Sequence, residues 1–335
     1  EDRNTFKIFL LAVLGVIFIF TAVSTFNLFI TTASGSYFLW AIVSSVLFLT
    51  LTVLQVFFIK SGVKLFFILF FESALTLIIF YKYLYPKPSL ILLSAPILLF
   101  IFLALAVNHG SKILSNSIKI HFIPVARTII PKAVTGLLLF LVILVYLNYF
   151  EWGRFNEKLG QALVNQTLIG STPAFRIWTP QYSYNQTTQN FLEGIAENQL
   201  NRFKPTLFND SSFDFESFNF DNLPAEQKKL LISQAAKELE STFEDLLGGP
   251  LNSNEPLNLA AYRLTKDYFK DLAPQAKSFL GIIIAAFLFF FLKGVAILFY
   301  WLIEFLSFIL FKFLIAVGFA YVSLETRSRE FVLLK

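Results

Sequence analysis

The sequence contains no cysteine and no methionine, and it has only two histidines, His109 and His121, among 335 residues. The absence of cysteine excludes disulfide scaffolds, thiolate catalysis, iron–sulfur clusters and cysteine-based zinc sites. Two histidines so far apart in the chain do not indicate a metal site. Charged residues are also scarce, at 15% of the chain, against about 25% in an ordinary globular domain. We therefore expect no metal and no cofactor.

What the sequence has in excess is apolar residues, which make up 56% of the chain and include 43 phenylalanines. They are gathered in blocks long enough to cross a bilayer, which requires about 20 apolar residues for a hydrocarbon core of about 30 Å. Five such blocks lie in the first half of the chain, at residues 8–30, 37–59, 63–84, 89–107 and 133–150. The first block is too long, and too weakly basic at its start, for a cleaved signal peptide. The sequence thus predicts an integral membrane protein.

A further apolar block at residues 278–322 is 45 residues long, about twice the length that one span requires. We expect a hairpin of two spans that turns at Lys293 and Gly294, because the lysine would lie at the interface and glycine tolerates unusual backbone angles. The alternative is one span followed by an interfacial helix, which the few polar residues of 302–322 disfavour. The predicted fold is an all-α polytopic bundle of about seven spans with a polar tail at 323–335.

The charges are unevenly distributed along the chain. Residues 151–277 hold 12 Lys and Arg residues and 16 Asp and Glu residues, so the remainder carries a net charge of +9. Short cytoplasmic loops carry an excess of Lys and Arg. If the N-terminus lies on the cytoplasmic side, the inner loops contain eight basic residues and the short outer loops contain two, Lys82 and Lys87. We predict that the N-terminus and the loop 108–132 are cytoplasmic and that residues 151–277 are extracytoplasmic.

Two crossings in residues 278–322 would also place the tail outside, although its basic residues Arg327, Arg329 and Lys335 favour the inside. Basic residues are not gathered on one soluble region, so we expect the lipid bilayer rather than nucleic acid as a partner.

Residues 151–277, between the fifth and sixth predicted spans, change to the pattern of amphipathic helices. We expect helices near 154–168, 186–203, 224–247 and 257–272, hence a mostly helical extracytoplasmic domain. Asp221 or Asn222 is a candidate cap for the third helix, which Gly248, Gly249 and Pro250 would end. Alternating residues at 117–123 and, more loosely, at 322–334 predict strands, which can pair only if the tail is cytoplasmic.

Ionisable residues inside apolar blocks are costly and commonly have a partner or a function. Glu72 lies within the third predicted span, and Lys293, Glu304 and Lys312 lie within the last block. One interpretation is that Glu72 is a proton- or ion-coupling carboxylate paired with Lys293 or Lys312, and the other is that it only holds helices together. Lys293 and Glu304 would lie on nearly the same face if one helix carried both.

The segment from Asp210 to Asp221 has oxygen-bearing side chains at some positions of a calcium loop, but Phe215 stands where that loop needs glycine. We therefore expect no metal there. The alternating residues Phe213, Phe215, Phe218 and Phe220 are candidates for packing on the helical core or for binding a partner. No G-x-S-x-G, H-E-x-x-H, Walker or G-x-G-x-x-G motif occurs, so no catalytic residue is predicted and a non-enzymatic role is favoured.

We expect a non-enzymatic multi-pass membrane protein whose domain 151–277 binds a partner protein or organises a membrane or envelope complex. The first alternative is a transporter or channel that uses Glu72 with Lys293, Glu304 and Lys312, although no internal repeat is evident. The second alternative is a membrane-embedded enzyme that modifies lipids.

Overall fold

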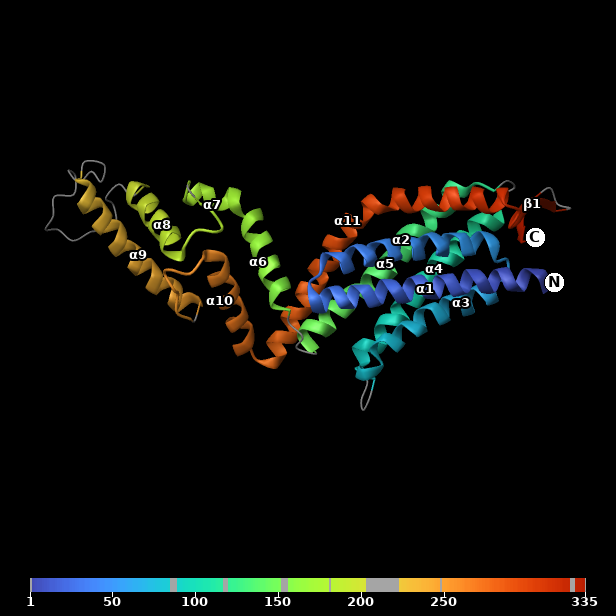
Figure 1. The fold of residues 1–335 in the computed structure, drawn as a ribbon, viewed down its shortest axis with the longest axis horizontal. Coiled ribbons are helices and arrows are strands. Elements are labelled where there is room, and N and C mark those ends of the chain that lie inside the picture. The colour runs from blue at the N-terminus through green and yellow to red at the C-terminus, as the bar shows by residue number, and fades with distance from the viewer. Residues whose placement is uncertain are drawn as a thin grey trace. The chain divides into compact units, whose positions relative to one another are not determined.

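The computed structural model describes residues 2–84, 89–116, 120–151, 156–180, 182–202, 223–247, 249–325 and 329–334. The chain divides into two compact units. Unit 1 comprises Glu1–Asn156 and Ser278–Lys335, and unit 2 comprises Glu157–Lys277. Both units consist mainly of helices (Figure 1).

Unit 1 contains the long apolar helices, which run alongside one another (Figure 1). In chain order these helices are α1 (Asp2–Thr32), α2 (Gly35–Phe58), α3 (Gly62–Ala74), the 3-10 helix η1 (Leu75–Tyr83), α4 (Leu90–Asn116), α5 (Phe122–Tyr146), the π-helical turn η2 (Leu147–Glu151) and α11 (Pro274–Ala316). Within the described residues, six helical segments are long and apolar enough to cross a membrane. This count indicates a multi-pass membrane protein. The helices α4 and α5 extend well into the predicted loop 108–132.

Helix α2 forms the centre of unit 1. Every residue from Phe48 to Phe58 is buried, so this part of the helix is enclosed on all sides. A helix that is hydrophobic around its whole circumference belongs in the core of a bundle. The connection between α1 and α2 is short. Within it, Ala33 has a φ of 57°, and this left-handed backbone conformation reverses the direction of the chain. Short connections make consecutive helices antiparallel neighbours, and α1 packs along α2.

The last apolar block forms a single helix instead of the predicted hairpin. Helix α11 runs without interruption through Lys293 and Gly294, so the predicted turn at these residues is wrong and the seven-span count is not confirmed. Lysine is a good helix former, and one glycine costs a helix only about 1 kcal/mol. The helix ends at Ala316, and Gly318, two residues later, has a φ of 75°. There the amide of Phe319 donates to the carbonyl of Leu314 and that of Gly318 to Ile315, the closing pattern that a left-handed glycine permits.

Helix α11 is fixed at both ends of unit 1. Near its start, an ideal Cβ on Gly281 would lie 2.8 Å from Cγ of Phe150, the last residue but one of η2. Near its end, the ring centroid of Phe311 lies 5.1 Å from those of Phe57 and Phe122. Because Phe122 begins α5 and Phe150 follows its end, these two contacts show that α11 and α5 run antiparallel.

The tail forms an antiparallel hairpin of β1 (Ala320–Glu325) and β2 (Arg329–Leu334), with Val322 opposite Val332. This confirms the expected strand character of the tail. The strand predicted at 117–123 is wrong at its end, since Phe122 and Ile123 begin α5, and residues 117–119 lie outside the described residues. Lys7 near the start of α1 donates to the carbonyl of Phe319 at 2.7 Å. The N-terminus and the tail therefore lie at the same end of unit 1 (Figure 1).

Unit 2 consists of shorter amphipathic helices. They are α6 (Glu157–Gly170), α7 (Thr172–Trp178), α8 (Thr188–Arg202), α9 (Ala225–Leu247) and α10 (Leu257–Asp271). Four of them match the ranges expected from the periodicity, whereas α7 was not predicted because seven residues hold too few turns for a clear pattern. A small core joins α8 to α9 through Leu192, Ala196 and Ala236.

Candidate functional site

The most deeply buried polar group in unit 1 is the pair formed by Glu72 on α3 and Gln55 on α2. Both side chains are fully buried. Nε2 of Gln55 lies 2.6 Å from Oε1 of Glu72 and 3.5 Å from the carbonyl oxygen of Leu11 on α1. The other carboxyl oxygen of Glu72, Oε2, and the amide oxygen of Gln55, Oε1, are both buried with no hydrogen-bond partner among the described residues. The pair thus joins three helices and has unused hydrogen-bonding capacity.

Glycine at position 15 makes this arrangement possible. An ideal Cβ on Gly15 would lie 1.9 Å from Oε1 of Glu72 and 3.0 Å from Nε2 of Gln55. The carboxyl group of Glu72 therefore occupies the space that any larger residue of α1 would need. The carboxyl group is also next to a change in helix type, because α3 ends at Ala74 and the chain continues from Leu75 as 3-10 helix with a kink at Phe80.

The structure does not bring the four predicted intramembrane residues together. The hydrogen-bond partner of Glu72 among the described residues is Gln55, not Lys293 or Lys312. Glu304 forms an ion pair with Arg127 of α5 at 3.2 Å, in which the side chain of Glu304 is 14% exposed and that of Arg127 is 69% exposed. Each lysine lies over the ring of the phenylalanine one turn before it, Lys293 at 5.6 Å from Phe289 and Lys312 at 5.7 Å from Phe308.

Sequence reasoning missed three participants in these contacts, Gln55, Gly15 and Arg127. Gln55 and Gly15 carry no charge that would mark them, because amides and glycines are common at contacts between membrane helices. The signal that was available for Gln55 is its position in an otherwise apolar half of α2, where a carboxamide needs a polar partner. The predicted residues Phe213, Phe215, Phe218 and Phe220, and the calcium-like segment that contains them, lie outside the described residues.

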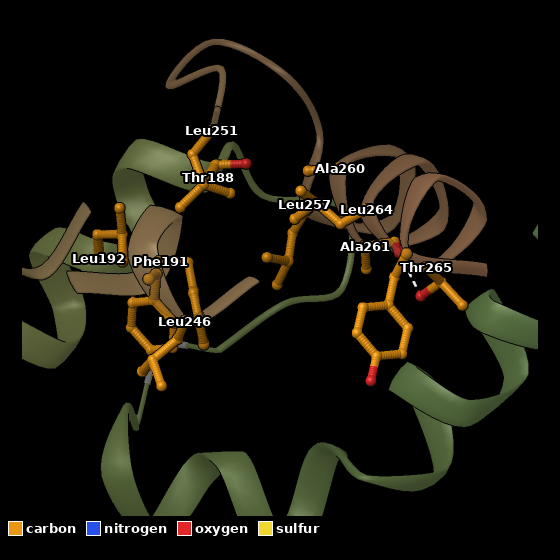
Figure 2. Close-up of a pocket in the computed structure, with 12 residues that line it drawn as sticks. Thr188, Phe191, Leu192, Leu246, Leu251, Leu257, Ala260, Ala261, Leu264 and Thr265 are labelled. Atoms are coloured by element: carbon orange, nitrogen blue, oxygen red, sulfur yellow. Dashed lines mark hydrogen bonds between the residues drawn. The ribbon is translucent and has the colours of Figure 1, made fainter. Parts of the chain in front are cut away.

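Unit 2 has an apolar groove of about 530 Å³ between α8, α9 and α10, which we call the α8–α10 groove. Figure 2 shows side chains of α10 on one side of the groove and side chains of α8 and α9 on the other. Twelve residues line it, and they are Thr188, Phe191, Leu192, Phe243, Leu246, Leu251, Leu257, Ala260, Ala261, Leu264, Thr265 and Tyr268. Apart from the hydroxyl groups of Thr188, Thr265 and Tyr268, the lining side chains are purely apolar.

The opposite side of α10 is occupied by α6. Asn258 donates to Asn165 of α6 at 3.0 Å, and Lys266 donates to Glu157 at the start of the same helix. The hydrogen bond from Lys266 to Glu157 raises the pKa of the lysine. Tyr262 lies between them on α10, and burial raises the pKa of its phenol. Helix α10 is therefore held by α6 through one face and presents the other face to the groove.

Comparisons with protein-family models, with curated proteins and with solved structures find no match for this chain. Its function is therefore argued from its own geometry.

Proposed function

We propose that this protein is a non-enzymatic membrane-anchored binding protein whose α8–α10 groove receives an amphipathic helix of a partner protein. The observation that carries the proposal is the apolar stripe of α10 along the groove, in which Leu264 is buried and Tyr268 is 58% exposed. Leu257, Ala261, Leu264 and Tyr268 line the groove at intervals of four, three and four residues, which is the spacing of one helix face. Helix-in-groove recognition uses such a stripe together with matching residues on the partner.

The dimensions of the groove favour a helix as its occupant. From Leu257 to Tyr268 the stripe covers 12 residues, which corresponds to about 17 Å, or three helical turns. The small side chains of Ala260 and Ala261 at the middle of the stripe allow a second backbone to approach closely. Leu246 on the facing wall is 76% exposed and Tyr268 is 58% exposed, so large apolar groups are available at both edges. A partner helix would bury these groups, which stabilises a complex in proportion to the apolar area removed from water.

The predicted residues Phe213, Phe215, Phe218 and Phe220 are candidates for the same partner contact. Their segment connects α8 to α9 in the chain, and both helices contribute to the groove. An aromatic segment beside an apolar groove would enlarge the surface that a partner covers.

The proposed topology has six spans. The N-terminus and the tail are cytoplasmic and unit 2 is extracytoplasmic. The proposal is supported by the excess of Lys and Arg in the loops on the side of the N-terminus and by the contact of Lys7 with Phe319. A single crossing by α11 returns the tail to the side of the N-terminus, where its basic residues Arg327, Arg329 and Lys335 are favoured.

The two alternatives gain no support from the arrangement of the side chains. A transport site built from Glu72, Lys293, Glu304 and Lys312 is not favoured, because each of the four has a different neighbour. A lipid-modifying active site requires a nucleophile or a general base beside a cleft. The residues that line the α8–α10 groove include no titratable group other than the Tyr268 phenol.

The absence of cysteine permits a direct test by site-specific cross-linking. A photoactivatable cross-linker is attached to a single cysteine at Thr265, in the groove, or at Asp267, an exposed position on α10 outside it. The full chain is irradiated in membranes of its source cells, and adducts are mapped by mass spectrometry. We expect Thr265→Cys to form adducts with one segment of a second protein, at residues that are three, four or seven positions apart. Asp267→Cys is expected to form no such adducts.

A matched pair of substitutions tests whether the groove is responsible. Leu246 and Leu230 lie on the same helix and are 76% and 59% exposed, but only Leu246 lines the groove. Leu246→Asp is expected to abolish the adduct, whereas Leu230→Asp leaves it in place. Adducts with lipid acyl chains, adducts with residues 203–222 of the same chain, or equal labelling from Asp267→Cys would each overturn the proposal.

A further inference from the structure

Glu72 lies in unit 1 without a positive charge to balance it. An ionised carboxylate accepts about four hydrogen bonds, but the described residues supply one to Oε1 of Glu72 and none to Oε2. The ion pairs Arg127–Glu304, Arg263–Glu255 and Lys266–Glu157 do not include Glu72. An unpaired charge in an apolar interior costs several kcal/mol or more.

The basic residues nearest to this site along α1 and α3 lie about two helical turns from it. Lys7 on α1 and Lys64 on α3 are each eight residues from Gly15 and Glu72 respectively, which is about 12 Å along a helix. On α4, His109 bonds to the carbonyl of Leu105. No hydrogen bond or ion pair with Glu72 is described for Tyr37 on α2 or for Lys112 on α4.

The site fits a proton better than a metal ion. Hard metal ions such as Ca²⁺ take about six to eight oxygen ligands, whereas the pair offers two unused oxygens. No group of three or more His, Cys, Asp or Glu side chains is found among the described residues. A proton requires one oxygen to carry it, and Oε2 of Glu72 is buried with no hydrogen-bond partner among the described residues.

We propose that Glu72 and Gln55 form a proton-binding site within the membrane helices, in which the Glu72 carboxyl group carries the proton on Oε2 while its Oε1 accepts the hydrogen bond that Nε2 of Gln55 donates. The same amide group faces the carbonyl oxygen of Leu11, so both of its contacts are with acceptors. The proton makes the carboxyl group neutral, which removes the cost of an unpaired charge in the apolar interior.

Release of the proton would act on the contact between three helices. It would leave a negative charge on the carboxyl group that packs against Gly15 of α1. The 3-10 segment η1 begins at Leu75, three residues after Glu72, and is interrupted by a kink at Phe80, where the backbone is not helical. A 3-10 stretch that continues an α-helix often marks a hinge. Loading and release of the proton are therefore coupled to the packing of α1 on α3 and to this segment.

The test is infrared absorption of the full chain in detergent micelles at neutral pH. A protonated carboxyl group has a C=O stretching band that ionised carboxylates lack. We expect this band in the wild-type protein and in Glu304→Gln, and its loss in Glu72→Gln, whose neutral amide resembles the protonated acid in shape. Gln55→Leu is expected to retain the band and shift it, because the carboxyl C=O group loses the hydrogen bond that the amide donates to it.

Three outcomes would overturn the proposal. They are absence of the acid band from the wild-type protein, persistence of the band in Glu72→Gln, and its replacement by carboxylate bands when potassium in the buffer is exchanged for sodium. The first and third comparisons use the wild-type protein alone. The proposal therefore remains testable if Glu72→Gln does not fold.

Discussion

Gly15 determines how closely α1 approaches the Glu72–Gln55 pair. Substitution by alanine would place a methyl group on the Glu72 carboxyl oxygen, since the ideal Cβ lies 1.9 Å from it. We expect Gly15→Ala to lower the free energy of unfolding by about 1–3 kcal/mol, the usual cost of overpacking a close-packed site. The measurement is thermal or denaturant-induced unfolding in detergent micelles.

Gly294 provides the matched control for Gly15. It lies within α11, and a Cβ at this position would have no neighbour within 4 Å. Gly294→Ala is expected to stabilise the protein by at most about 1 kcal/mol, because alanine is the better helix former. If Gly15→Ala also raised stability, the close contact between Gly15 and Glu72 would be wrong.

The same site shows what the sequence predicts at the scale of single residues. Glu72 was recognised because an acid inside an apolar span is rare and costly. Its partner was not, because the pairing of Glu72 with Gln55 depends on how α2 and α3 pack, and no local pattern records that. Lysines at Lys293 and Lys312 were the more obvious counter-charges, but their side chains lie along α11 over neighbouring phenylalanine rings.

Among the helices, α11 departs most from the expectation drawn from the sequence. Block length alone favoured two spans, since 43 residues of helix extend about 65 Å and one crossing needs about 30 Å. The decisive information is tertiary. Gly281 packs against Phe150 at one end of unit 1 and Phe311 joins Phe57 and Phe122 at the other. These contacts require the helix to continue through Lys293 and Gly294.

A distance measurement distinguishes the continuous helix from the hairpin. Spin labels are attached to cysteines introduced at Ser278 and Phe305, both exposed on α11. These positions are 27 residues apart, so a continuous helix separates them by about 40 Å. A hairpin that turns at Lys293 and Gly294 would bring them to within about 10 Å, the distance between packed helices. Pulsed electron resonance on the full chain in nanodiscs gives the distance, and a dominant short component would contradict the single helix.

For the whole molecule, the division into apolar bundle and amphipathic helical segment could be anticipated, because it depends on composition and periodicity that are local in sequence. The amphipathic helices α6, α8, α9 and α10 lie close to their expected ranges. The α8–α10 groove could not be anticipated, since the 3.6-residue pattern of α10 shows that the helix has an apolar face but does not show which neighbour covers it.

The last prediction concerns the sidedness of the whole chain. Single cysteines are placed at Ser36, Ser115, Asn254 and Ser328, and intact cells are treated with an impermeant thiol reagent. We expect Ser36 and Asn254 to be labelled from outside, because α1 carries the chain across the membrane once and unit 2 is proposed to be extracytoplasmic. Ser115 and Ser328 should be labelled only after permeabilisation, since α4 ends at Asn116 and a single crossing by α11 returns the tail to the side of Lys7. Labelling of Ser328 from outside would contradict the single crossing, and labelling of Ser115 from outside would invert the orientation.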